Sequence, residues 1–212
     1  TEDLFLMTRS SEDAPPVPAY VTIAFERGLP VAVDGVALGP VGIIERLNQV
    51  GGLHGVGRID LVEDRLVGMK SRGIYETPGG TLLYAAHSEL EQLTLDRRTL
   101  ALKDAIAPRY ADLVYEGRWW STERVAMDAL VDVTQQAVTG EVRLKLHRGN
   151  VTVAGRWSAQ SLYDERFVTF GEDDVYQQSD AAGFIRLFGL PSRVAALKAQ
   201  EAALAPTLAA AD

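Results

Sequence analysis

Two segments in the C-terminal half of the chain, in which apolar and polar residues alternate, constrain the fold most strongly. In EVRLKLH (141–147), Val142, Leu144 and Leu146 point to one face, and after an Arg-Gly-Asn turn VTVAGRW (151–157) returns. Apolar residues at every second position are typical of half-buried strands, and a short glycine-containing turn joins antiparallel neighbours. The two segments therefore predict a β-hairpin within an antiparallel sheet that has one buried face.

A second hairpin is predicted near the start of the chain. YVTIAFERG (20–28) carries Val21, Ile23 and Phe25 on one face, and VAVDG (31–35) follows a Gly-Leu-Pro turn. Both segments are rich in β-branched and apolar residues, which favours strands.

Helical spacing accounts for much of the remaining chain. In 40–52, the apolar face would be Val41, Ile44, Leu47 and Val50, with a glycine pair ending the helix. Proline inside a helix removes one hydrogen bond, so we expect Pro108 to break or kink its helix. Ser121 is a suitable N-cap, with Glu123 in the first turn. The later predicted helices cover 81–93, 95–117, 121–138 and a segment beginning at Ser179 or Asp180.

Composition excludes several classes of protein. The chain of 212 residues has no cysteine, so a disulfide framework, a Cys-based zinc site and a thiol nucleophile are ruled out. A net charge of −8 argues against nucleic-acid binding. No apolar run is long enough to cross a membrane, and neither a signal peptide nor a metal-type spacing of the three histidines is visible.

The predicted fold class is α+β, mainly antiparallel strands with helices. Residues 1–18 form a proline-containing N-terminal segment, 19–190 a main domain, and 191–212 an alanine- and leucine-rich helical arm. A lone terminal helix gains little stability in water. The arm either frays or packs on another subunit, and we expect the second.

The stretch 54–78 concentrates polar groups of both charges among apolar residues. One interpretation is a solvated strand face with ordinary cross-strand ion pairs. The other is a site for a zwitterionic ligand such as an amino acid, in which charged groups meet their opposites and a phenol adds a hydrogen bond. The residues open to both interpretations are Arg58, Asp60, Glu63, Asp64, Arg65, Lys70, Ser71, Arg72, Tyr75 and Glu76.

Two glycine pairs, Gly51-Gly52 and Gly79-Gly80, belong to no nucleotide-binding pattern such as GxxxxGK[ST] or GxGxxG. We interpret them as a helix end and a helix start. The second pair could still offer backbone N–H groups to an anion.

HGVGRIDLVEDRLVGMKSRGIYETPGGTLLYAAH (54–87) closely resembles the central signature of the argininosuccinate synthase family. The similarity continues through LVYEGRWWS (113–121), the hairpin region 140–165 and SDAAGFI (179–185), and so covers most of the chain.

This resemblance implies a cytoplasmic ligase of arginine biosynthesis. Members join citrulline and aspartate at the expense of ATP, used with Mg²⁺, through a citrullyl-adenylate, and release pyrophosphate and AMP. It also implies an N-terminal nucleotide-binding domain, an α+β C-terminal synthetase domain and a homotetramer assembled through the arm. No nucleic acid or membrane partner is expected.

The resemblance also identifies site residues. The glutamate of VED aligns with Glu63 and the tyrosine of GIYE with Tyr75, and both positions contact citrulline in the family. Their expected contribution is to position the substrate rather than to act as a base. Lys70, Ser71 and Arg72 match the motif too, as second-tier candidates for the site or for the interface with the nucleotide domain.

One family feature is missing. The chain has no SGGxDTS pyrophosphate loop, and it begins at Thr1. We therefore expect a C-terminal portion of a longer or cleaved polypeptide, inactive without its nucleotide-binding domain. The alternative is a non-catalytic oligomerisation module derived from that domain.

Overall fold

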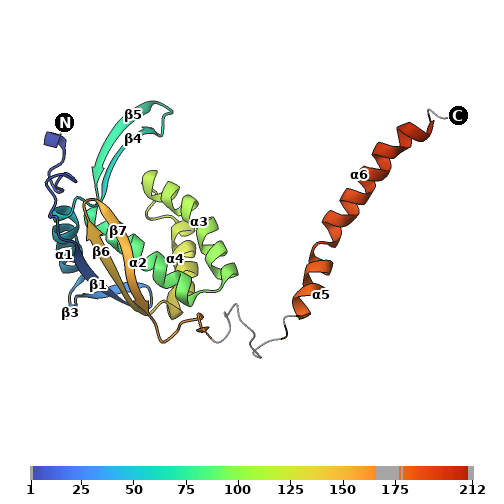
Figure 1. Cartoon of the computed structure of the whole chain (residues 1–212). Coiled ribbons are helices and arrows are strands. Elements are labelled where there is room, and N and C mark those ends of the chain that lie inside the picture. Colours follow the sequence, from blue (N-terminus) through green and yellow to red (C-terminus); the bar gives the residue numbers. More distant parts are fainter. Residues whose placement is uncertain (1, 166–176, 178, 210–212) are drawn as a thin grey trace. The chain divides into compact units, whose positions relative to one another are not determined.

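The structure, a computed structural model, describes residues 2–165, 177 and 179–209. Its main element is a five-stranded antiparallel sheet in the order β3-β2-β1-β6-β7 (Figure 1). The strands are β1 (Ala19–Glu26), β2 (Leu29–Val33), β3 (Val36–Ala37), β6 (Gly140–His147) and β7 (Asn150–Trp157).

Both predicted hairpins are confirmed, but the turn of the first lies at Arg27-Gly28 rather than Gly-Leu-Pro, because Leu29 and Pro30 already pair with β1. In the late hairpin, β6 pairs with β7 and Leu144 lies opposite Val153, while Arg148 and Gly149 both have positive φ in the connecting turn. A turn with two positive φ angles matches the right-handed twist of the flanking strands. The central pairing joins β1 to β6, 115 or more residues apart in sequence, with Val21 opposite Leu144.

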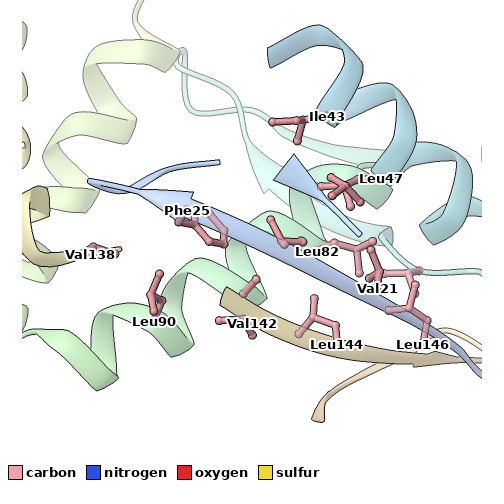
Figure 2. Packing of buried hydrophobic residues seen from close by; sticks show 14 of the residues in the cluster. Val21, Phe25, Ile43, Leu47, Leu82, Leu90, Val138, Val142, Leu144 and Leu146 are labelled. Carbon is pink, nitrogen blue, oxygen red and sulfur yellow. The ribbon is translucent and has the colours of Figure 1, made fainter. Parts of the chain in front are cut away.

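One face of this sheet carries the main hydrophobic core. Val21, Ile23 and Phe25 of β1 are buried with the alternating residues of β6, as the sequence predicted. Two helices cover this face, α1 (Pro40–Leu53) and α2 (Pro78–Thr94), and the sheet and helix side chains interdigitate (Figure 2). From α2, Leu82, Ala86 and Leu90 are fully buried at intervals of four residues.

The predicted apolar face of α1 is partly wrong. Leu47 is buried as expected, but Val41 is 71% exposed and Ile43, which the spacing did not select, is 1% exposed. The glycine pair lies inside the last turn, because the helix continues to Leu53. There Gly52 accepts a hydrogen bond from Arg9 N at 2.9 Å, and a Cβ on it would collide with the carbonyl oxygen of Met7. The helix therefore ends one residue after the pair, and the glycines also permit close backbone packing.

Two further helices follow, α3 (Arg97–Tyr115) and α4 (Thr122–Thr134). Pro108 lies inside α3, which continues through it, so of the predicted break or kink the break is wrong. The Ser121 hydroxyl accepts from Arg124 N, which confirms the predicted N-cap of α4. Short 3₁₀ helices occupy Glu2–Leu4 and Gln135–Ala137.

A separate two-stranded ribbon extends beyond the main sheet (Figure 1). It consists of β4 (Arg58–Asp64) and β5 (Lys70–Glu76), joined by a turn at Arg65–Met69. Apolar and charged residues alternate over 58–70, which predicts strand structure, and the glycines of this stretch predict tight bends, one of which forms at Gly68 with a φ of 84°. The sheets and helices together confirm the α+β class.

The chain divides into two compact units, Thr1–Tyr163 and Asp164–Asp212. The described part of the second unit holds α5 (Ser179–Phe188) and α6 (Leu190–Ala209), which confirms the helix start predicted at Ser179. The pattern of 161–178 favours neither helix nor strand, and most of this segment lies outside the described residues. In the described ranges no helix has the length and apolar character needed to span a bilayer.

Candidate functional site

The β4–β5 ribbon sorts the candidate residues onto two faces. Glu63 lies opposite Ser71, and Tyr75 follows four residues later on β5. Because side chains alternate along a strand, these three residues share one face. Lys70 and Arg72 lie on the other face. The structure therefore brings Glu63, Ser71 and Tyr75 together and separates the two cationic candidates from them.

Glu63 and Tyr75 make a direct contact. The Tyr75 hydroxyl donates a short hydrogen bond to Glu63 Oε1. This bond, followed by desolvation and by the negative charge of Glu63, raises the pKa of Tyr75. Tyr75 is 44% exposed, so both groups remain within reach of a ligand. The pair presents a phenol and a carboxylate as one polar unit.

Other groups border this unit. Arg65 Nε lies 3.3 Å from the Ser71 hydroxyl, and the Tyr115 hydroxyl of α3 lies 3.4 Å from the carbonyl oxygen of Asp64. An open depression of about 680 Å³ lies between the end of β4 and α3. It is lined by Asp64, Ala111, Asp112, Val114 and Tyr115.

The opposite face carries cross-strand ion pairs. Arg72 contacts both carboxylate oxygens of Asp60, at 2.8 and 2.6 Å, and Lys70 Nζ lies 2.7 Å from Asp64. The two hydrogen bonds from Arg72 hold the pKa of Asp60 below its ordinary value. The ribbon thus carries cross-strand ion pairs on one face and the Glu63–Tyr75 contact on the other, so the interpretation as ordinary ion pairs accounts for one face only.

The base of the ribbon is fixed to the N-terminal segment. Glu76 accepts from the backbone N–H groups of Leu6, Met7 and Thr8 at 2.7–3.0 Å. Arg58, opposite Glu76, donates to the Thr8 hydroxyl and carbonyl oxygens, both at 2.7 Å. Burial opposes ionisation of Glu76, but the bonds from Thr8 and its neighbours outweigh it and lower the pKa. Sequence reasoning included Glu76 among the polar groups without assigning it this role.

A buried polar cluster lies elsewhere, beside a cavity of about 650 Å³ that Arg27 and Asp132 also line. Glu91 is 2% exposed and is bound by Lys103 Nζ at 2.6 Å and by Gln135 Nε2 at 2.8 Å. Its polar groups are satisfied among themselves. Within the described residues no three His, Asp or Glu side chains are grouped as metal ligands.

The glycine pair at the start of α2 is used internally. Gly79 N donates to the Asn48 side chain at 2.8 Å, and Gly79 is buried against α1. This contact occupies one of the two N–H groups that the pair could offer to an anion, and the start of α2 at Pro78 agrees with the interpretation of the pair as a helix start.

Comparison with known proteins places these features in a family. Residues 1–195 match the family described as the arginosuccinate synthase C-terminal domain. An argininosuccinate synthase of Desulfitobacterium hafniense is 59% identical over 203 residues, which cover 96% of this chain and 51% of the relative. Those of Pelotomaculum thermopropionicum and Acetivibrio thermocellus are 59% and 61% identical, over 95% and 88% of this chain.

The chain spans about half the length of the curated relatives it matches. The family match includes the whole β4–β5 ribbon and the N-terminal segment fixed to its base. This chain belongs to the argininosuccinate synthase C-terminal domain family.

Proposed function

We propose that this chain is the synthetase-domain part of an argininosuccinate synthase. The complete enzyme would join citrulline and aspartate at the expense of ATP. The ureido oxygen of citrulline attacks the α-phosphorus of ATP to give citrullyl-adenylate and pyrophosphate. The aspartate amine then displaces AMP and forms argininosuccinate.

The Glu63–Tyr75 contact is the observation that carries the proposal. A carboxylate has about four acceptor positions, and Tyr75 occupies one of them. The free positions suit the N–H groups of a ureido substrate. The phenol oxygen keeps lone pairs for a further donor. The pair therefore suits a neutral, N–H-rich group and would hold it in place for attack on phosphorus.

The remaining substrates would bind mainly outside this chain. The described residues provide no three-carboxylate or histidine set for Mg²⁺. ATP with its Mg²⁺, and most of the aspartate site, are assigned to the N-terminal nucleotide-binding domain that the family resemblance implies. Lys70, Ser71 and Arg72 would support the site or contact that domain. No chemical step is assigned to a residue of this chain.

Pyrophosphate release tests the proposal. The 212-residue chain given ATP, citrulline and aspartate should release none, and addition of a nucleotide-binding domain should restore turnover. In the complete enzyme, Glu63→Ala should raise the KM for citrulline or lower kcat, with an unchanged circular dichroism spectrum. Unchanged kinetics would remove Glu63 from the site. Citrulline-dependent release by the chain alone would contradict the two-domain account.

A second candidate is a non-catalytic assembly module, favoured by the large apolar side chains that α5 exposes, Phe184, Ile185, Leu187 and Phe188. In the first proposal, α5 and α6 would instead support assembly of a homotetramer in the cytoplasm. The coding sequence upstream distinguishes the two. An open frame containing SGGxDTS supports the enzyme, whereas a start codon at the boundary supports the module.

A further inference from the structure

Gly73 lies between the two proposed citrulline-binding residues. It is the β5 residue two positions before Tyr75 and pairs with Leu61 of β4, on the face that also holds Glu63. A Cβ built on Gly73 would lie 2.8 Å from the Tyr75 hydroxyl and 2.9 Å from Glu63 Oε1, and it would overlap the Tyr75 ring. The ring crosses directly over this glycine to reach the carboxylate.

The backbone at Gly73 does not itself require glycine. Nearby Gly55, Gly57 and Gly68 have φ angles of 72°, 90° and 84°, which favour glycine, whereas Gly73 is not among the residues with positive φ. Glycine in a strand interior weakens the strand. Glycine at position 73 therefore leaves space for the side chains of Tyr75 and Glu63, which meet above it.

From this arrangement we infer that Gly73 is a positioning residue, whose missing side chain lets Tyr75 lie across β5 and bond Glu63 in the geometry that binds the ureido group. The ureido part rests on the proposed function. The Tyr75–Glu63 part depends only on the ribbon.

Gly73→Ala is a suitable test because the atoms it meets are ends of flexible side chains. The added methyl group should displace the Tyr75 ring and the Glu63 carboxylate while the backbone stays in place. The thermal unfolding midpoint should be unchanged or slightly higher, since alanine restricts the unfolded chain more than glycine does. Gly155→Ala is the matched control. Gly155 lies on β7, and its Cβ would meet nothing within 4 Å.

The first readout needs no activity. Tyrosine labelled with ¹³C at Cζ reports the ionisation of Tyr75 in this chain by NMR, with Tyr75→Phe assigning the signal. Glu63, Arg65 and Tyr115 are the titratable groups near this hydroxyl. Gly73→Ala should lower the pKa of Tyr75 toward its value in Glu63→Gln, and Gly155→Ala should leave it unchanged. A Gly73→Ala titration identical to wild type would overturn the inference.

The second readout is kinetic and uses the complete enzyme. Gly73→Ala should raise the KM for citrulline at least about tenfold, with a smaller change in the KM for ATP, since a hydrogen bond to a charged group is misplaced. In a Tyr75→Ala background it should have a smaller effect, because only the Glu63 carboxylate is then left to be displaced. If Glu63→Ala raises this KM and Gly73→Ala does not, the inference fails. If neither variant changes it, the proposed function of the site fails instead.

Discussion

At the scale of single residues, two lysine–carboxylate pairs of almost equal length differ in burial. Lys103 lies 2.6 Å from Glu91, and Lys70 lies 2.7 Å from Asp64. The side chain of Glu91 is 2% exposed, whereas that of Asp64 is 61% exposed. A carboxylate that loses its partner in the interior cannot be solvated by water, so burial rather than distance determines the cost of breaking each pair.

We predict that Lys103→Met lowers the free energy of unfolding by about 2–3 kcal/mol, somewhat below a fully buried pair because Lys103 keeps some contact with water. Lys70→Met should change it by less than about 1 kcal/mol. Urea unfolding of this chain measures both. The double variant Lys103→Met/Glu91→Leu should recover much of the loss. Equal effects of the two single substitutions would contradict the argument from burial.

The buried side chain of His54 should make the stability of the fold depend on pH. His54 is 3% exposed, and its Nδ1 atom has no hydrogen-bond partner among the described residues. Burial, with a smaller effect of nearby His147, lowers its pKa below the ordinary value of 6.5. The unfolded chain therefore takes up a proton before the folded chain does, so stability falls as the pH drops below about 6.5 and levels off below the folded pKa.

Urea unfolding between pH 7.5 and 5, above the range where most carboxylates titrate, measures this dependence. His54→Leu should remove most of the slope over this range, and His87→Gln should leave the His54 contribution in place. A slope that His54→Leu does not change would show that other groups cause it.

At the scale of elements, the N-terminal segment and the β4–β5 ribbon are coupled through Glu76. Its carboxylate accepts from three successive backbone N–H groups, of Leu6, Met7 and Thr8. We predict that Glu76→Ala increases hydrogen exchange at these amides by about tenfold to a hundredfold, the range for lost bonds to a charged acceptor. Exchange at the β1–β6 pairing should stay unchanged. Equal exchange throughout both proteins would mean that the carboxylate does not hold the segment.

The sequence predicts elements well where one periodicity dominates. Alternation in β1 and β6 identified the buried faces because each strand has one face toward the core, for example Ile23 and Val142. Helical spacing failed at Val41 because α1 packs on α2 and β2, which selects a neighbouring helical stripe that includes Ile43. At Pro108 the predicted break is wrong, because α3 continues through the residue despite the hydrogen bond that proline cannot donate.

The candidate site was predictable in part. The motif identified Glu63 and Tyr75, which are twelve residues apart in the sequence. Their contact depends on the strand register, which places Glu63 opposite Ser71. Local spacing does not fix that register, because the alternation runs through the turn at Arg65–Met69 and the glycines of the stretch predict bends without locating them. The same register places Lys70 and Arg72 on the opposite face of the ribbon from Ser71. It also places Gly73 beneath the Tyr75 ring.

At the scale of the whole molecule, the exposed apolar side chains of the second unit indicate that this chain associates with other subunits. The described side chains of this unit include large apolar groups that stay exposed, such as Phe188, 76% exposed although it stacks on Phe184, and Leu197, 49% exposed. An alanine-rich helix gains most of its stability from packing, so these groups would be covered by another subunit. The proposed arm, residues 191–212, would then contribute directly to the oligomer.

We predict that deleting 191–212 shifts this chain toward smaller species in sedimentation velocity. Leu197→Glu should weaken association at least about tenfold, because it removes one apolar contact and buries a charge. Gln200→Glu adds the same charge at an exposed polar position of α6 and should leave the distribution unchanged. If the full chain and the deletion sediment alike, the arm is not an assembly element. If Gln200→Glu dissociates the oligomer as much as Leu197→Glu, added charge rather than lost apolar packing is the cause. A selective effect of Leu197→Glu would assign the exposed apolar residues of α6 to the subunit interface.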